Sequence, residues 1–521
     1  MTVQEHPVVV VGAGPVGLSA ALAMARHGTP VRIIDAADTP SDYSKALVLW
    51  RRSIQVLDPV IPHEAVHSGH HPVNGLEFRS DGKRLAYLDF DSKDRGLVAG
   101  LLVPQYDTER MLAQALVELG IQIERSTCLK SFKADEEGVD LQLEGPGGLE
   151  SVRTQWLGGC DGGHSTIRHG LGIEFPGETS DRKWLLADIV IAEEEDPSRV
   201  FIETSTAGTT AFFPMGPSHW RVVADAGPVV EGEPPAEVTV EMVAELLATR
   251  TSRDWTIIKS PWLTEFRVNE RQIEQYVHGR VLLAGDAAHV HSPAGGQGMN
   301  TGIQDAFNLG WKLSLVLAGG APESLMQTYH EERHPIGAMV VRESSRLLKF
   351  GTDNRPLARG IRSVMLPLVA SLGPARRKIM AMLTEDAVNY RQSSLAGIGR
   401  HHARCVPGDA FPDVQIMVKG ESRSSTDLLR AGPVTLIVIG PAQETGGFRF
   451  GRDCDGFEVS TFRIDDDAEV QDPHHELASR FGLVNGGLIL VRPDGVVAAV
   501  EMCVEDLNRW SAMRLLGEST V

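Results

Sequence analysis

Several features that would place the chain in a specialised class are scarce in its sequence. Five cysteines are scattered over 521 residues, at positions 128, 160, 405, 454 and 503, with no Cys-x-x-Cys pair. Neither a disulfide framework nor a metal site is therefore predicted, and a reducing compartment is expected. No apolar run approaches the roughly 20 residues of a membrane span, and the first residues, MTVQEHP, lack a basic signal-peptide region. We expect a cytoplasmic protein without a membrane partner.

Positive charge is also in short supply. Lys and Arg together number 50 against 69 Asp and Glu, so the formal net charge is −19. A chain this acidic is a poor partner for nucleic acid or for an anionic membrane surface. Apolar residues make up 42% and charged residues 23%, as in ordinary globular proteins, and the length predicts two or three domains.

A glycine-rich turn follows the first apolar segment. Four valines at 8–11 predict a buried parallel strand, GAGPVG at 12–17 gives Gly-x-Gly-x-x-Gly, and an alanine-rich helix follows; a second strand at 31–34 ends at Asp35. This order is the context of a dinucleotide-binding fingerprint, although a glycine-rich turn of an unrelated α/β protein is the alternative. The acid at 35 favours FAD or NAD over NADP as the tightly bound nucleotide.

A second glycine-rich loop lies between a strand predicted at 281–284 and a buried helix predicted up to 317. Asp286 follows the strand, and the loop contains Pro293, Gly295, Gly296 and Gly298. Such a loop and the start of its helix can point several N–H groups at developing negative charge. Asp286 can accept hydrogen bonds from the hydroxyls of a sugar or polyol. The alternative is a strand-loop-helix turn packed tightly by its glycines.

Three further stretches carry candidate polar residues. CDGGHSTIR at 160–168 contains Asp161 and a predicted helix cap, and it reads equally well as a turn or as a site. Lys45 and Arg52 lie in a basic, apolar segment that could meet phosphates, although solvated surface charge is the usual reason for such a cluster. Gln105 starts a predicted amphipathic helix and is a candidate for contacting a ligand.

Short β-type runs dominate residues 181–267. Strands are predicted at 184–191, 199–204, 209–215, 220–225 and 256–268, around one helix at 238–251. We expect an antiparallel sheet inserted into the nucleotide-binding domain. Its inward face is predicted to line an apolar cavity with Phe201, Phe212 and Trp220, although most such residues in a sheet are simply core.

The remaining segments complete a predicted domain plan. Residues 1–75, 98–180 and 268–345 form the nucleotide-binding domain, and 76–97 with 181–267 form the inserted sheet domain. Residues 346–400 form a helical connector, and 401–521, which mix short strands and helices, form a C-terminal α/β domain.

The three motifs at 12–17, 160–168 and 285–300 together resemble the single-component flavoprotein aromatic hydroxylases of the p-hydroxybenzoate hydroxylase fold. The tail resembles the thioredoxin-like C-terminal domain of the phenol hydroxylase and polyketide-tailoring branch, including LVRPDG at 490–495, but without its redox cysteines. The resemblance implies an α/β fold: a Rossmann-like FAD-binding domain with an inserted antiparallel substrate sheet, and a thioredoxin-like C-terminal domain.

The resemblance also implies roles for individual residues. The ADP half of FAD would lie on Gly12, Gly14, Pro15, Gly17 and Asp35. Lys45, where the family usually has Arg, would be a looser phosphate partner, with Arg52 as the second basic residue. Gln105 would contact the FAD chain, Asp286 the ribitol, and Asp161 both FAD and NAD(P)H. The isoalloxazine would be lined by Pro293, Gly295, Gly296, Gly298, Met299 and Asn300.

The activity implied is hydroxylation of a phenolic or polycyclic aromatic substrate. Tightly bound FAD would be reduced by NADPH or NADH and would react with O₂ to a C4a-hydroperoxide, with Pro293, Gly296 and Gly298 forming the catalytic flavin loop. The general base stays open among His219, His289, His291 and Tyr43. A Baeyer–Villiger or epoxidising flavoenzyme of secondary metabolism and a non-catalytic flavin- or ligand-binding protein are the alternatives. Either a monomer or a homodimer is expected.

Overall fold

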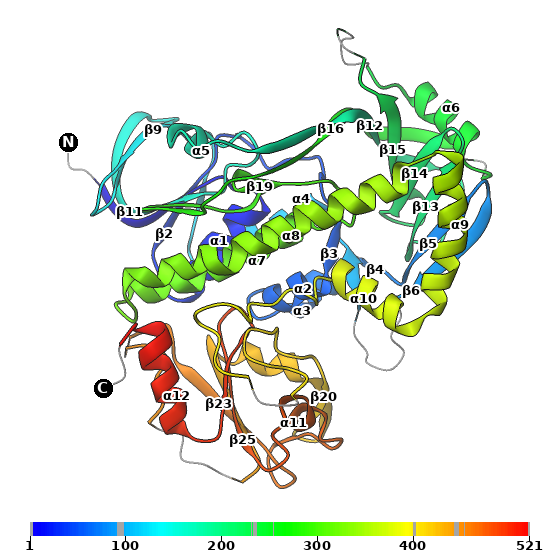
Figure 1. Ribbon diagram of the computed structural model, residues 1–521. Helices are drawn as coiled ribbons and strands as arrows, with labels where there is room; N and C mark the ends of the chain where they lie inside the picture. Colours follow the sequence, from blue (N-terminus) through cyan, green and yellow to red (C-terminus); the bar gives the residue numbers. More distant parts are fainter. Residues whose placement is uncertain are drawn as a thin grey trace.

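A computed structural model describes residues 4–90, 98–230, 232, 237–253, 255–399, 403–441, 447–452 and 454–518. The nucleotide-binding part and the inserted sheet lie at opposite ends of a long helix, α8 (Gln327–Thr352), and the C-terminal domain packs beneath the former (Figure 1). Among the described residues, no helix is both long and apolar enough to cross a membrane.

The first sheet is built around the valine strand. β1 (Gln4–Val11) runs parallel to β2 (Val31–Ile34) on one side and to β11 (Gly148–Gly159) on the other. The full path is β17 (Val277–His278), β18 (Val281–Leu283), β11, β1, β2 and β8 (Ile123–Glu124), and β10 (Val139–Gly145) and β9 (Cys128–Ala134) extend it from β11. Residues 8–10 are fully buried, as expected for a strand covered on both faces.

Three helices pack around this sheet. α1 (Pro15–Arg26) lies against α7 (Gly298–Leu317) and α4 (Gln105–Glu118). The register then fixes where the loops meet: Val11 pairs with Ile34 and with Gly159, and Gly159 pairs with Leu283. The carboxyl ends of these four strands therefore lie at one edge of the sheet, which is where α/β proteins bind ligands.

The second sheet matches the predicted insertion. Its order is β19 (His289–Val290), β16 (Ile257–Gln272), β12 (Gly177–Ile191), β15 (His219–Pro228), β14 (Gly208–Pro214), β13 (Arg199–Ser205), β5 (Gly75–Ser80) and β6 (Lys83–Asp89). Neighbours along it are antiparallel except β13 and β5. α6 (Val240–Arg250) covers one face, because Val243 and Leu247 pack into the core beneath it.

Short elements connect the two large sheets. β3 (Val48–Trp50), β7 (Gly100–Leu102) and β4 (His71–Pro72) form a three-stranded sheet, and α2 (Arg51–Leu57) and α3 (His63–His67) follow β3. After α8, α9 (Pro356–Ser371) packs on β6, and α10 (Gly373–Leu383) returns towards β3 (Figure 1). α8 is continuous across position 345, where the domain plan set a boundary.

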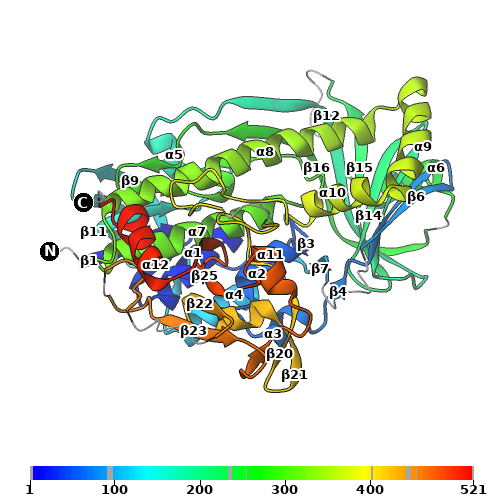
Figure 2. The ribbon, with the colours of Figure 1, turned by 60° about the horizontal axis from the view of Figure 1, so that its bottom comes forward.

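The C-terminal domain contains a seven-stranded sheet. Its order is β21 (Glu421–Ser424), β20 (Gln415–Val418), β24 (Val470–Gln471), β23 (Val459–Ile464), β22 (Val434–Ile439), β25 (Gly487–Val491) and β26 (Val497–Glu501). The helices of this domain include α11 (Glu476–Phe481) and α12 (Val504–Trp510). Figure 2 shows this domain in front of α2 and α3.

Candidate cofactor cleft and active site

Two glycines of the first turn are required by the protein itself. Gly12 has a φ of +100°, and a Cβ there would lie 2.4 Å from the carbonyl oxygen of Cys160. A Cβ on Gly17 would lie 1.8 Å from the carbonyl oxygen of Gly12. Both distances are impossible, so these glycines let the turn fold against β11 and against its own helix.

Gly14 is different, because no protein atom needs the space beside it. Its φ is −79°, and a Cβ there would meet nothing within 4 Å. It caps α1 without a side-chain hydrogen bond, Pro15 follows at the first helical position, and the first turn holds no acid. The N–H groups at this helix start are thus free for an anion. An open glycine at an uncapped helix start fits the pyrophosphate of FAD.

Asp35 lies beside this turn, as predicted. Its Oδ2 accepts a hydrogen bond of 2.5 Å from the Ala13 N–H, and its Oδ1 accepts one of 2.8 Å from the Ala37 N–H. The guanidinium of Arg125 lies 3.6 Å away. Asp35 therefore holds the glycine turn in place, and its remaining lone pairs can accept ribose hydroxyls.

Gln105 ties α4 to the segment before β3. Its backbone N–H donates to Ser44 Oγ at 2.8 Å, and its side-chain oxygen accepts from the Ala46 N–H at 3.1 Å. Its Nε2 donates to Glu109 at 2.8 Å, and burial raises the pKa of that carboxyl. Lys45, between Ser44 and Ala46, is exposed. Gln105 thus fixes the backbone on both sides of Lys45.

Asp286 lies in the 3₁₀ turn η1 (Gly285–Ala287) that follows β18. Its side chain is exposed, yet the surrounding protein raises the pKa of its carboxyl, opposed in part by the charges of His289 and Lys45. Asp286 is therefore open to solvent at the carboxyl edge of the first sheet. Within the described part of the chain no hydrogen bond to its carboxylate is found, so Asp286 can accept hydroxyls of the FAD ribitol.

The loop before α7 is clamped to β3. The indole Nε1 of Trp50 donates to the Gly295 carbonyl at 2.8 Å, and Asn300 Nδ2 donates to the carbonyls of Gly296 at 2.9 Å and Val48 at 2.8 Å. Asn300 Oδ1 accepts from the Trp50 N–H at 2.8 Å. Asn300 is fully buried, so it shapes the loop through this clamp.

The start of α7 is free for a ligand. Gln297 caps the helix without a side-chain bond, and the first turn carries no acid. Pro293 is exposed, Gly298 is half-buried and Met299 is buried. The N–H groups from Gly298 onward therefore face the cleft without a capping oxygen, and they fit the negative end of a reduced isoalloxazine.

A buried carboxylate that sequence reasoning missed supports this helix. Asp305 on α7 accepts hydrogen bonds from His289 Nε2 at 2.7 Å, Arg333 Nε at 2.6 Å and the Gly285 N–H at 3.2 Å. Burial alone would raise the pKa of Asp305, but Arg333 and His289 outweigh it and hold that pKa below its usual value. His289 is thus tied to Asp305, which weakens its candidacy as the base.

His291 is the other histidine of this loop. Burial lowers its pKa to about 4, so the ring is neutral at physiological pH, and its Nδ1 lies 2.9 Å from the Ser292 carbonyl. Its Nε2 is buried without a hydrogen-bond partner among the described residues. A Cβ on Gly298 would lie 3.4 Å from this nitrogen, which places His291 beside the start of α7.

The middle motif holds the turn that carries Asp286. Asp161 accepts from Ser165 Oγ at 2.6 Å and from the Ile167 N–H at 3.2 Å, and so caps α5 (Thr166–Gly170). Arg168 donates to the Ala287 carbonyl at 3.1 Å and to the Gly163 carbonyl at 2.7 Å. In the structure this motif is therefore chiefly a brace between β11 and η1.

Arg52 does not lie with the other cofactor residues, contrary to the prediction. It is buried, and its guanidinium donates to the Asp494 carbonyl of the C-terminal domain at 2.7 Å. Arg52 lies in the first turn of α2, and its guanidinium extends from there to the C-terminal domain. Arg52 is therefore part of the contact between α2 and the C-terminal domain.

The predicted cavity wall is also wrong for the three aromatic residues named. Phe201 and Phe212 stack at 4.3 Å between ring centroids, and both pack with Trp220 against Trp255 on the face covered by α6. They are the core between the sheet and that helix. Strand alternation then puts the neighbouring residues on the opposite face.

That opposite face carries a polar group. Arg221, next to Trp220 in β15, forms a buried ion pair with Asp188 through hydrogen bonds of 2.7 and 2.8 Å. Its guanidinium lies over the ring of Trp262, which in turn packs against Tyr43 at 5.4 Å. The Tyr43 contact joins this face to the segment that precedes Lys45.

The chain is similar to known proteins in both sequence and fold. The profile of a family described as FAD binding domain matches residues 5–344. A 12-dehydrotetracycline 5-monooxygenase/anhydrotetracycline 6-monooxygenase of Streptomyces rimosus is 32% identical over 95% of both chains. A rifampicin monooxygenase of Streptomyces venezuelae is 36% identical, covering 74% of this chain and 79% of its own.

A solved structure agrees with these relatives. CabE, an aromatic hydroxylase from angucycline biosynthesis, superposes with a TM-score of 0.79 at 28% identity over 99% of this chain and all of its own. The resemblance drawn from the three motifs is thereby confirmed. The chain belongs to the FAD binding domain family, and it is an FAD-dependent monooxygenase.

Proposed function

We propose that the chain hydroxylates a phenolic, polycyclic aromatic substrate with NADPH or NADH as reductant and O₂ as oxidant. The observation that carries this proposal is the pair of uncapped helix starts, at Gly14 and at Gly298, on one edge of the first sheet with Asp286 in the cleft. Bound FAD would accept the reducing equivalents of the nicotinamide and activate O₂.

The protein contributes binding and electrostatics to this reaction. The N–H groups at Gly14 would hold the phosphates, and the carboxylate of Asp286 would orient the ribitol. The N–H groups at the start of α7 would stabilise negative charge on the redox ring. Trp50 and Asn300 keep that helix start in position, because both bind the loop before it.

The inner face of the inserted sheet supports an acidic aromatic substrate. Arg221 Nη1 is buried without a hydrogen-bond partner among the described residues, although the rest of its guanidinium binds Asp188. A buried donor on a cation is costly to leave unpaired. A phenolate or enolate oxygen of the substrate would pair with it, and Trp262 beside it would stack on a ring.

All three candidate histidines carry a ring nitrogen without a hydrogen-bond partner among the described residues, His289 at Nδ1. His219 lies two residues before Arg221 and so on the same face of β15. Burial lowers its pKa, and its Nε2 has no hydrogen-bond partner within the described residues. His291 has the same properties beside α7. The lowered pKa of each of these two rings disfavours its protonated form, so each is suited to accept a hydrogen bond from a phenol rather than to keep its proton.

Substrate-stimulated oxidation of NADPH and NADH tests the proposal. FAD-loaded protein is mixed with simple phenols, naphthols and tetracyclic polyphenols, and the product masses are measured by mass spectrometry. We expect one polycyclic phenol class to accelerate nicotinamide oxidation and to gain one oxygen atom. Bound FAD with no acceleration by any compound would contradict the proposal and favour a non-catalytic flavin protein. A lactone product would favour the Baeyer–Villiger alternative.

Arg221→Met refines this test. Losing a charged hydrogen bond to substrate should raise KM for the phenol roughly tenfold to a hundredfold. Arg253→Met is the matched control, because Arg253 lies over Phe201 on the face covered by α6. It should leave KM unchanged.

A further inference from the structure

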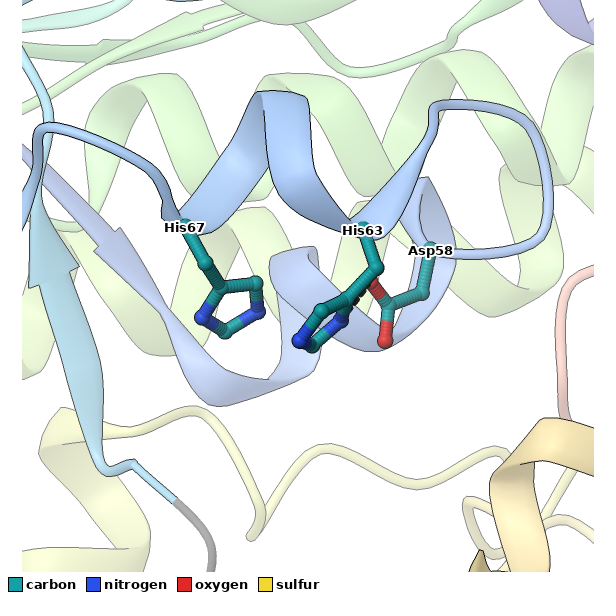
Figure 3. Close-up of side chains that lie close together, drawn as sticks. All are labelled: Asp58, His63 and His67. Atoms are coloured by element: carbon teal, nitrogen blue, oxygen red, sulfur yellow. Dashed lines mark ion pairs between the residues drawn. The ribbon is translucent and has the colours of Figure 1, made fainter.

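Two histidines and an aspartate come together on the surface of α3, apart from the cofactor cleft. His63 and His67 are four residues apart and therefore share one face of that helix. Their rings stack at 3.9 Å between centroids, and Asp58, at the end of α2, lies beside them (Figure 3). One donor atom from each of the three residues lies within 4.8 Å of the others.

The donor atoms of this group lack hydrogen-bond partners. His67 Nε2 and Asp58 Oδ1 are both buried without one among the described residues. His63 Nδ1 lies 3.6 Å from Asp58 Oδ1, too far for a hydrogen bond. An unpaired buried ring nitrogen beside an unpaired carboxylate oxygen suits a cation, which both atoms can ligate.

We propose that Asp58, His63 and His67 bind one divalent transition-metal ion of the zinc class. Two imidazole nitrogens and one carboxylate oxygen are ligands that Zn²⁺ takes at about 2.0–2.2 Å. Ligands of a tetrahedral ion at that distance are about 3.4 Å apart. The three donors already lie within 4.8 Å of one another, so small side-chain movements on binding would bring them into range. The fourth position stays open to water.

The surroundings favour a single-oxygen contact from Asp58. Its Oδ2 lies 3.2 Å from the guanidinium of Arg430 in η3 (Ser425–Arg430) of the C-terminal domain. Arg430 thus occupies one carboxylate oxygen and orients the other towards the histidines, as a neighbouring group does around many bound metals. Its positive charge also lowers the affinity, so we expect a moderate site.

The ion would strengthen the contact between two domains. It joins the end of α2 to α3 and fixes the carboxylate that meets Arg430. Binding to the folded state alone raises stability. Zinc should therefore raise the melting temperature of the full-length protein.

Zinc titration of the FAD-loaded chain tests the site. The protein is freed of any affinity tag, dialysed against EDTA and titrated with ZnCl₂ by isothermal calorimetry. We expect one ion per chain in the wild type. His63→Asn, His67→Asn and Asp58→Asn should each weaken binding by about tenfold or more. His474→Asn, which changes an exposed histidine outside the cluster, should leave binding unchanged.

A second measurement covers variants that fail to fold. X-ray absorption at the zinc edge of the loaded wild type should show two imidazole nitrogens in the coordination shell. Zinc binding that is as tight in His63→Asn and His67→Asn as in the wild type would overturn the proposal. So would a shell with fewer than two imidazoles, or the absence of one-to-one binding.

Discussion

At the residue scale, Gly14 separates what the fold needs from what the cofactor needs. Gly12 and Gly17 are required by contacts within the protein, whereas the space beside Gly14 is open. A residue with an ordinary φ and open space beside its Cα does not have to be glycine for the protein to fold. We therefore infer that glycine stands at position 14 to let a ligand approach the backbone.

Gly14→Ala should consequently fold normally and bind FAD poorly. The added methyl group would occupy the approach of the pyrophosphate, so we expect at least about a tenfold loss of FAD affinity, with the melting temperature of the apoprotein unchanged. Gly360→Ala in α9 is the control, because a Cβ there also meets nothing within 4 Å. Fluorescence titration with FAD measures both. Equal affinities in the two variants would contradict this role for Gly14.

Glu385 is a buried acid at the contact between the connector and α7. Its carboxyl accepts hydrogen bonds from Thr301 Oγ1 at 3.1 Å and from Gln304 Nε2, and burial raises its pKa to about 8. In the unfolded chain it ionises near its ordinary pKa of 4.5. Folding therefore favours the protonated form, and stability falls as pH rises from about 4.5 to about 8.

Glu385→Gln should remove that loss. The amide can accept from Gln304 and donate to Thr301, so the hydrogen bonds remain possible. The variant should gain over the wild type as pH rises, by up to about 4 kcal/mol in the free energy of unfolding at pH 8. Urea unfolding at pH 5, 6.5 and 8 measures the difference. A difference that does not grow with pH would show that Glu385 is ionised in the folded protein.

At the scale of elements, the loop before α7 depends on β3. Asn300 binds three backbone groups of these elements, and Trp50 binds a fourth. The sequence identified the glycines of the loop and the helix after it. It could not identify Trp50 as their partner, because the two lie about 245 residues apart and only folding brings them together.

Asn300→Ala should leave the Trp50 N–H and the carbonyls of Val48 and Gly296 unpaired. We expect a loss of about 2–4 kcal/mol in stability and weaker FAD binding, since the start of α7 loses its support. Asn389→Ala, at an exposed asparagine with two local hydrogen bonds, is the control. Thermal unfolding with and without FAD measures both. A variant as stable as the control would exclude the clamp.

The inserted sheet shows a limit of strand patterns. Alternation correctly placed its strands and grouped Phe201, Phe212 and Trp220 on one face. Alternation alone cannot say which face a helix covers, and α6 covers this one. The polar pair on the other face, Arg221 and Asp188, carries no pattern in the sequence because its partners meet across two strands.

At the scale of the whole molecule, buried charges hold the C-terminal domain in place. Glu332 on α8 accepts hydrogen bonds from Lys312 on α7 and from Arg492 after β25, all within 2.9 Å, and Arg492 also binds Asp494. Burial acts to raise the pKa of Glu332, but Arg492 and Lys312 hold it far below its usual value. Removing one member of such a buried ion network leaves its partners with uncompensated charge and is strongly destabilising.

Glu332→Gln should therefore destabilise the whole chain. The substitution leaves the buried charges of Lys312 and Arg492 only partly compensated, which lowers the free energy of unfolding by about 3–5 kcal/mol. Glu343→Gln on the same helix is the matched control, because Glu343 pairs with exposed arginines and should change stability by less than about 0.5 kcal/mol. Chemical denaturation measures both. Similar stabilities in the two variants would show that the network is dispensable.

The central claim concerns where FAD lies, and a crystal structure of the FAD-loaded protein tests it most directly. We expect the pyrophosphate on the N–H groups at Gly14, the ribitol beside Asp286 and the redox ring at the start of α7, facing the sheet side that carries Arg221. A flavin ring away from Gly298, or a pyrophosphate away from Gly14, would contradict it.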